Sequence, residues 1–322
     1  MQLPLLSLLP LAARAVNIVS SNDDGWAESN IRALYDSLTA AGNSVVLSAP
    51  ADNQSGKGKP GSARGMHTTM YEVLNDDCIG SLDQDPSDRS DPCQYDSCPA
   101  NSGPYGHNVT DPHLNWVNSH PVTSMRYGID RFAPSFFDGA PDLAVSGPNV
   151  GANLGISVFF SGTVGAATYA SHTAGIPALA FSGKTDSPTA WNASSTYPLF
   201  SQVYADLATR VTSQIVKSGT PYLPEDVWLN VNFPEVSDSK CSRPEDVKFV
   251  LSRIFDHSFI SGDDVETCGN KELPSETHVV NTDGCYASVS VGNADDKRDA
   301  NATMQAVVLD KLGNLLTCLP DD

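Results

Sequence analysis

One stretch near the start of the chain, residues 16–25, limits the possible folds more than any other. An apolar, β-branched run ends there in Asp23, Asp24 and a glycine, which is typical of a buried strand followed by a sharp turn. Apolar residues then recur at helical spacing over residues 28–41. The two aspartates are therefore predicted to lie at the carboxyl end of a strand, where open α/β sheets bind ligands.

The two adjacent carboxylates, Asp23 and Asp24, repel each other unless something neutralises them. A hard divalent cation does this best, because carboxylate oxygens are its natural ligands. The alternative is a turn with solvated aspartates, since turns favour Asp and Gly. For this motif taken alone the turn is the better interpretation, so the rest of the chain has to decide.

Composition favours a folded enzyme-sized chain and disfavours nucleic acid as a partner. The 322 residues, 40% of them hydrophobic, suffice for one large α/β domain or two small ones. A net charge of -19 argues against non-specific binding to nucleic acid polymers or to anionic membrane surfaces. An acidic protein that binds phosphate needs local positive charge, which a metal ion supplies.

The N-terminal residues indicate export. Residues 1–15 are apolar and end in small residues, which resembles a secretory signal peptide with its cleavage site. We assign residues 16–322 to a single domain of a secreted, extracellular protein and expect no membrane span. Four Asn-x-Ser/Thr sequons agree with a secreted glycoprotein: Asn53, Asn108, Asn192 and Asn301.

The seven cysteines fit an oxidising compartment, and the absence of a Cys-x-x-Cys pair argues against a zinc site. We expect disulfides within each of two groups, with the partners left open. The odd count leaves one thiol free or paired between chains. The groups are Cys78, Cys93 and Cys98, and then Cys241, Cys268, Cys285 and Cys318.

A second apolar run, residues 44–50, completes a strand–helix–strand unit, which predicts right-handed parallel pairing. The small-residue loop that follows it, with Ser55, then lies at the same sheet edge as the aspartates. Residues 75–118 show no periodicity and are expected to form an irregular insertion. A lid over a site and a surface insertion without a role are both open, and we favour the second.

The most informative region begins at a predicted buried strand, residues 141–146, and continues as a glycine-rich segment with Asn149 and Asn153. Ser161, Gly162 and Thr163 then precede a helical run over residues 164–173. Backbone N–H groups at such a helix start form an anion site. The alternative is a glycine-rich connection with a Ser or Thr N-cap. Further strands are predicted at residues 176–182 and 228–234, a helix at 197–218, and hairpins around 286–291.

Taken together, these motifs resemble the SurE family of metal-dependent phosphatases, also called survival-protein nucleotidases. The resemblance implies an α/β fold, a three-layer αβα sandwich with a Rossmann-like, mostly parallel sheet, and a homo-oligomer. The matching pieces are Ser21-Asn22-Asp23-Asp24-Gly25, Ser55-Gly56, Ser146 to Gly155 and Ser161-Gly162-Thr163-Val164, with weaker matches at Leu229 to Pro234 and Thr282-Asp283-Gly284.

The resemblance also implies a single divalent metal ion with four oxygen ligands. These oxygens suit Mg²⁺ or Mn²⁺, and Ca²⁺ less specifically. Because a glycan at Asn53 would lie beside the site, we expect that sequon to be unoccupied. The implied metal ligands are Asp23, Asp24, Ser55 and Asn149, the catalytic residues Asp23 and Asp24, and the phosphate-binding residues Asn153, Ser161, Gly162 and Thr163.

The expected reaction is metal-assisted hydrolysis of small phosphate monoesters, as in an acid phosphatase or 5'-nucleotidase. Asp23 is the candidate general base or water-orienting group, with a covalent aspartyl intermediate as the alternative. Trp26 is equally well interpreted as a nucleobase-stacking or an edge-packing residue. No general acid is obvious: His172 lies near the anion loop in sequence, but a satisfied helix histidine is the better interpretation. The sequence departs from the family at Tyr169-Ala170 and at residues 119–122, which bears on the substrate.

Two rival functions remain. A secreted phosphate- or nucleotide-binding protein without turnover would keep the same fold, although the presence of all four implied ligands disfavours it. A dinucleotide-dependent enzyme is less favoured, because the first strand is followed by Asn-Asp-Asp-Gly and not by Gly-x-Gly-x-x-Gly.

Overall fold

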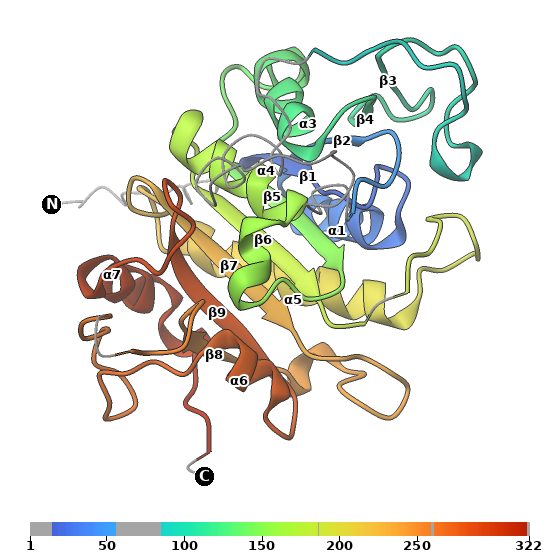
Figure 1. Ribbon diagram of the computed structural model, residues 1–322. Coiled ribbons are helices and arrows are strands. Elements are labelled where there is room, and N and C mark those ends of the chain that lie inside the picture. The colour runs from blue at the N-terminus through green and yellow to red at the C-terminus, as the bar shows by residue number, and fades with distance from the viewer. Residues whose placement is uncertain (1–14, 56–84, 186, 259–260, 321–322) are drawn as a thin grey trace, which may run out of the picture.

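One mixed sheet organises the residues that the computed structural model describes, which are 15–55, 85–185, 187–258 and 261–320. Its nine strands are β1 (Asn17–Ser21), β2 (Ser44–Pro50), β3 (Tyr105–His107), β4 (Leu114–Val117), β5 (Leu143–Val150), β6 (Ala178–Gly183), β7 (Val227–Phe233), β8 (Lys248–Ser252) and β9 (Tyr286–Asn293). They lie in the order β3-β4-β2-β1-β5-β6-β7-β9-β8 (Figure 1). The strands from β4 to β7 in this order are parallel, so their carboxyl ends share one edge.

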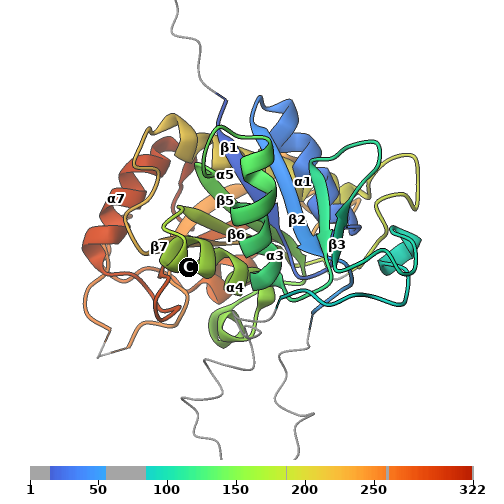
Figure 2. The ribbon, with the colours of Figure 1, turned by 90° about the horizontal axis from the view of Figure 1, so that it is seen from above.

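Helices cover both faces of this sheet and give the predicted three layers (Figure 2). One face packs against α1 (Ser29–Ala40) and α5 (Leu199–Lys217), and the other against α3 (Pro121–Tyr127) and α4 (Gly162–Thr168). Neighbouring residues of β1 point to opposite faces: Ile18 belongs to the core under α1 and α5, and Val19 to the core under α3 and α4. The central strands are therefore buried on both sides, which explains their nearly continuous apolar sequence.

The prediction of C-terminal hairpins is wrong, because neighbouring strands there are not joined by short turns. β9 runs antiparallel to β7 but follows it only after a long segment, and β8 pairs with β9 in parallel. Parallel neighbours need a crossover, which α6 (Glu276–Asn281) supplies. The alternating pattern at residues 286–291 located a strand correctly, but an alternating pattern does not specify the partner. A last helix, α7 (Ala302–Leu312), packs against α5 and β9.

The predicted insertion at residues 75–118 is only partly described, because residues 75–84 lie outside the described ranges. Its described part is not irregular throughout, since it contains β3 and the buried strand β4, which pairs with β2. Four residues are too few to show a period, so β4 has no recognisable signal in the sequence. Residues 1–14 of the predicted signal peptide, and Cys78, also lie outside the described ranges.

Three disulfides confirm the expected pairing within each cysteine group: Cys93–Cys98, Cys241–Cys285 and Cys268–Cys318. Within the described ranges, no helix is both long enough and apolar enough to cross a bilayer.

Candidate metal and phosphate site

The two aspartates emerge from β1 at the carboxyl edge of the parallel strands. Asp23 is 5% exposed and Asp24 is 1% exposed, so neither is a solvated turn residue. The Asn22 side chain closes the turn, because its Oδ1 accepts a hydrogen bond of 3.2 Å from the N–H of Gly25. This local closure fixes the two carboxylates before α1 begins.

Asp24 connects three segments that are far apart in the sequence. Its Oδ1 accepts a hydrogen bond of 2.9 Å from the hydroxyl of Ser55, and its Oδ2 accepts one of 2.8 Å from the N–H of Val150. The side chain of Asn53 accepts the N–H of Ser55 at 2.7 Å and so holds the loop after β2 in place. The predicted arrangement of Ser55 beside the aspartates is thus present.

Asp23 is bound from the opposite side of the site. The hydroxyl of Thr163 donates to its Oδ1 over 2.6 Å and lies 3.4 Å from Oδ1 of Asn149. Asn149 reaches this position because β5 carries an irregularity in its pairing with β6 between residues 146 and 149. Gly162 permits the close approach, since a Cβ there would lie 2.9 Å from Cβ of Asp23.

The carboxylate pair is electrostatically unusual. Burial raises the pKa of Asp23, and the hydroxyl of Thr163 partly offsets this. Burial raises the pKa of Asp24 well above its usual range, and the charges of Asp23 and Glu28 raise it further. No ion pair between the described residues involves either aspartate. Among the residues that the structure describes, two buried like charges thus meet without a cationic partner.

The chemistry of the donors fits a hard divalent cation. Asp23 and Asp24 offer carboxylates, Ser55 a hydroxyl and Asn149 an amide carbonyl, and the hydrogen bonds above bring these four side chains to one edge. No group of three His, Cys, Asp or Glu side chains in the described ranges has metal-site geometry. A cation here would therefore depend on two carboxylates supplemented by neutral oxygens, a set that suits Mg²⁺ or Mn²⁺.

The predicted phosphate-binding residues occupy different surroundings. Ser161 is the N-cap of α4, and its Oγ accepts the N–H of Val164 at 3.1 Å. The amide of Asn153 donates to Oγ of Ser182 at 2.9 Å, and the backbone N–H of Asn153 donates to Asn232. The Ser161–Thr163 segment thus adjoins the carboxylates directly, while Asn153 belongs to a neighbouring buried polar cluster.

Glu276, at the start of α6, is the centre of this cluster and was missed by the sequence reasoning. Its Oε1 accepts the N–H of Gly155 at 2.8 Å, and its Oε2 accepts Asn230 at 2.8 Å and Ser290 at 3.0 Å. Burial raises the pKa of this carboxyl to about 8. The available signal was the pair of asparagines, at 230 and 232, in an otherwise apolar strand, because a doubly buried strand must provide partners for them.

Two candidates with open interpretations are now resolved. Trp26 is 2% exposed and lies under the guanidinium of Arg32, 5.2 Å from its ring centroid, so it packs inside the fold and cannot stack on a substrate. His172 pairs with Asp226 over 2.9 Å and lies 3.7 Å from Asp295. These contacts agree with a satisfied structural histidine.

Comparison with known proteins identifies relatives over most of the chain. The family model described as "Survival protein SurE" matches residues 18–255. A protein of Yarrowia lipolytica (strain CLIB 122 / E 150) named acid phosphatase is 33% identical over 315 residues, covering 90% of this chain and 82% of its own length. A protein of Gloeobacter violaceus named 5'-nucleotidase SurE is 28% identical, covering 84% of this chain and 88% of its own.

A solved structure supports the fold. The crystal structure of the SurE protein from Aquifex aeolicus superposes with a TM-score of 0.55 and 21% sequence identity, covering 91% of this chain and 98% of that one. At this identity the likeness concerns the α/β architecture and not the chemistry.

Proposed function

Because the chain belongs to the Survival protein SurE family, we propose that it hydrolyses small phosphate monoesters at the Asp23–Asp24 edge with the help of one divalent metal ion. The observation that carries this proposal is the buried, unpaired carboxylate pair, which meets neutral oxygen donors from two other segments. The names of the relatives, acid phosphatase and 5'-nucleotidase, support the same reaction class.

In this proposal Asp23, Asp24, Ser55 and Asn149 hold the metal ion, with Mg²⁺ or Mn²⁺ as the expected species and Ca²⁺ as an alternative. When bound, such an ion polarises phosphoryl oxygens and lowers the pKa of a coordinated water. The chain contributes the positions of the donors. Val150 and Thr163 fix one oxygen each of Asp24 and Asp23, which reduces the freedom of both carboxylates.

The phosphate would bind along Ser161, Gly162 and Thr163. Support comes from the position of this segment beside Asp23, because the hydroxyl of Thr163 donates to Oδ1 of Asp23 and a Cβ at Gly162 would lie 3.1 Å from its Oδ2. Donors in this position stabilise the charge on the equatorial oxygens of a transferring phosphoryl group. Asn153 would support the neighbouring loop and contribute to phosphate binding from the Glu276 cluster.

Asp23 would orient the attacking water and accept its proton. A carboxylate held within reach of the water is suited to the role of general base. The hydroxyl of Thr163 donates to Oδ1 of Asp23, so Oδ2, which lies beside Gly162, would be the oxygen that contacts the water.

The test is phosphate release from a panel of monoesters, with chelator and then with Mg²⁺ or Mn²⁺ restored. We expect release that disappears with the chelator and returns with the metal. Binding of nucleotides without release under any metal condition would favour the alternative of a non-catalytic binding protein.

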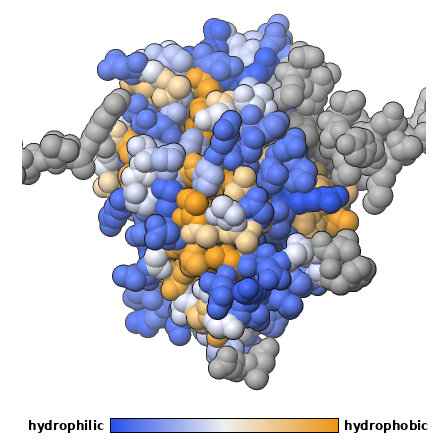
Figure 3. All heavy atoms as spheres, turned by 90° about the vertical axis from the view of Figure 1, so that its left-hand side faces the viewer, coloured by the Kyte–Doolittle hydropathy of each residue, from blue (hydrophilic) through white to orange (hydrophobic). Residues whose placement is uncertain are grey.

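The remaining proposals concern the whole molecule. Three disulfides agree with an extracellular location, and we propose a secreted protein whose mature chain starts near residue 16. A band of apolar residues crosses the face that lies on the left of Figure 1 (Figure 3), which supports the expected homo-oligomer. N-terminal sequencing of the exported protein and light scattering test these two points.

A further inference from the structure

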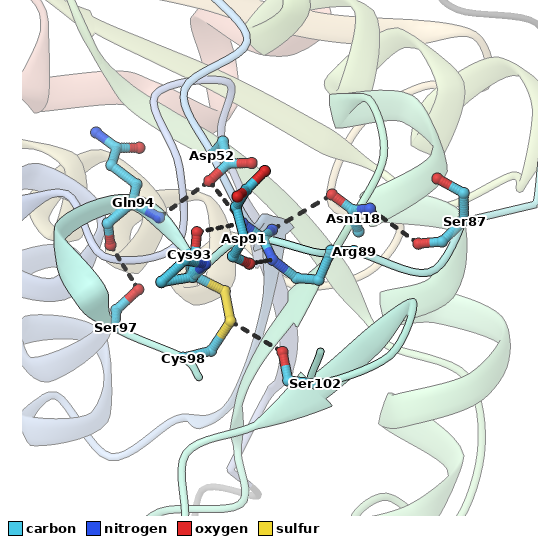
Figure 4. Close-up of a disulfide and its surroundings, with 11 residues drawn as sticks. Asp52, Ser87, Arg89, Asp91, Cys93, Gln94, Ser97, Cys98, Ser102 and Asn118 are labelled. Carbon is cyan, nitrogen blue, oxygen red and sulfur yellow. Dashed lines mark hydrogen bonds and ion pairs between the residues drawn. A yellow bond between two sulfur atoms is a disulfide. The ribbon is translucent and has the colours of Figure 1, made fainter. Parts of the chain in front are cut away.

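A short disulfide-closed turn, residues 93–98, lies beside the candidate site. Besides the Cys93–Cys98 bridge, the N–H of Cys93 donates to the carbonyl of Cys98 at 3.1 Å, and the hydroxyl of Ser97 donates to the carbonyl of Gln94 at 2.7 Å (Figure 4). Tyr95 has a φ of 59°, in the left-handed region that non-glycine residues seldom adopt. So many constraints on six residues indicate that the conformation of Tyr95 is imposed by the fold.

The turn is anchored to the loop that follows β2. The N–H of Gln94 donates to Oδ1 of Asp52 at 3.0 Å and to the carbonyl of Ala51 at 3.2 Å. Arg89 bridges the two segments, because its guanidinium contacts Asp52 at 3.2 Å and donates to the carbonyl of Asp91 at 2.7 Å (Figure 4). The turn therefore keeps a fixed place relative to the sheet edge.

The turn at residues 93–98 lies close to the aspartates, because it contacts Gly25. A Cβ at Gly25, whose φ is 103°, would overlap Oε1 of Gln94, so the turn packs directly on the backbone that follows Asp24. The next residue, Tyr95, is 37% exposed. Tyr95 directly follows Gln94, whose side chain makes the contact with Gly25, so the same fixed turn holds the Tyr95 ring on this side of the site.

We propose that Tyr95 is a specificity-determining residue whose ring stacks on a flat, aromatic leaving group of the phosphate monoester. The proposal rests on the function proposed above and names the substrate class: monoesters that carry a nucleobase or an aryl ring. Trp26, the aromatic residue nearest to the aspartates in the sequence, is buried and unable to serve. An aromatic side chain can stack on any nucleobase, and such stacking changes affinity by roughly 5- to 150-fold.

The first test compares substrates that differ in the leaving group. Tyr95→Ala should lower kcat/KM for adenosine 5'-monophosphate and 4-nitrophenyl phosphate by roughly 5- to 150-fold, and leave glycerol 3-phosphate unchanged. Tyr95→Phe should retain the wild-type values, because the ring stacks and the hydroxyl does not. Phe136→Ala is the matched control, since Phe136 is 38% exposed but packs on His113 near the β3 edge of the sheet.

A loss confined to adenosine 5'-monophosphate would identify the nucleobase as the stacked ring, and a loss for both aromatic esters would identify any flat ring. Equal losses for all three substrates, or no loss for the aromatic pair, would overturn the proposal.

The second test does not depend on turnover. Adenosine, which lacks the phosphate, should bind the full chain in EDTA, and Tyr95→Ala should weaken this binding by the same factor when both are measured by calorimetry. If the wild-type chain releases no phosphate from any ester, the proposed function fails, while adenosine binding still reports on Tyr95. Equal affinity of wild type and Tyr95→Ala for adenosine would contradict the assignment.

Discussion

Two pairs of aspartates with little solvent exposure differ in whether they have a cationic partner. In the C-terminal part, Asp264 and Asp299 surround Arg253, with N–O distances of 2.9 and 3.5 Å, and the amide of Gln305 donates to Asp264 at 2.8 Å. At the carboxyl edge of β1, Asp23 and Asp24 are more fully buried, yet neither belongs to any ion pair between the described residues.

The difference separates a structural group from a functional one. Burying a charge without a partner is costly, and the Arg253 group shows how this fold compensates when only stability is required. At the Asp23–Asp24 pair the cost remains, and the oxygens point toward the start of α4 and the loop with Ser55. An uncompensated pair of this kind is expected at a site whose cation comes from solution.

The largest expected effect is on catalysis at the unpaired aspartates. Asp23→Asn should lower the phosphatase rate by about 10²–10⁴-fold, the usual contribution of a general base, and the loss should persist at saturating Mn²⁺. Asp24→Asn and Asn149→Ala should recover part of their rate at high Mn²⁺, because they lose metal affinity. Asp138→Asn, at an exposed aspartate, is the control. Near-wild-type rates in both aspartate variants at limiting metal would refute a functional pair.

The next effect concerns stability at the paired aspartates. Arg253→Met should lower the free energy of unfolding by about 3–5 kcal/mol, because it leaves Asp264 and Asp299 without their cation. Arg243→Met is the matched control: this arginine pairs with Asp246 at the surface with 65% of its side chain exposed, so a much smaller loss is expected. Urea unfolding measures both, and equal losses would show that burial does not distinguish the two arginines.

Glu276 is a third case, a buried carboxyl that accepts hydrogen bonds from uncharged donors. We expect it to make the stability of the folded chain depend on pH. Its pKa is raised from 4.5 to about 8 in the folded chain. The folded state therefore favours the protonated form, and this contribution to stability is complete below pH 4.5 and is lost as the pH rises toward about 8. Since one pKa unit corresponds to about 1.4 kcal/mol, the loss should reach a few kcal/mol.

Urea unfolding of wild type and Glu276→Gln at pH 5 and pH 8 tests this dependence, with both chains in EDTA. The variant should be less stable at pH 5, because its NH₂ group faces a hydrogen-bond donor, and its stability should change less between the two pH values. Glu28, with a pKa of about 7, contributes to both chains equally. If the free energy of unfolding changes between pH 5 and pH 8 by the same amount in the variant as in wild type, Glu276 does not titrate in this range.

The smallest expected effect is a gain in the free energy of unfolding instead of a loss. In EDTA, Asp24→Asn should raise the free energy of unfolding at pH 7 by about 1–2 kcal/mol, because it removes one of two buried like charges. Asp264→Asn should lower it under the same conditions, since it breaks the pairing with Arg253. A loss of stability in both variants would mean that the two pairs of aspartates play the same structural role.

The parallel core of this fold was predictable from its sequence because its strands and helices carry local, periodic signals. The strand at residues 44–50 matches β2 residue for residue, and the helix predicted at 197–218 matches α5 within two residues at each end. The pairing of β8 with β9 was not predictable, since it depends on the crossover through α6 and not on the strands themselves.

The candidate site was predictable where sequence order alone brings residues together. Consecutive parallel strands end at one edge, so Ser55 was expected beside Asp23, whereas Asn149 was expected there only from the family resemblance. Glu276 and Tyr95 were not expected, because a turn closed by Cys93–Cys98 and a helix from the C-terminal part bring them there through tertiary contacts. Neither residue belongs to a local motif that sequence reasoning can recognise.

Calorimetric titration of Mn²⁺ into the metal-free chain tests the central claim most directly, because it detects cation binding without requiring turnover. Wild type should bind one Mn²⁺ per chain, Asp24→Asn should bind it much more weakly, and Asp264→Asn should bind as wild type does. Equal Mn²⁺ affinity in wild type and Asp24→Asn, or no saturable binding in wild type, would contradict the assignment of Asp23 and Asp24 as a cation site.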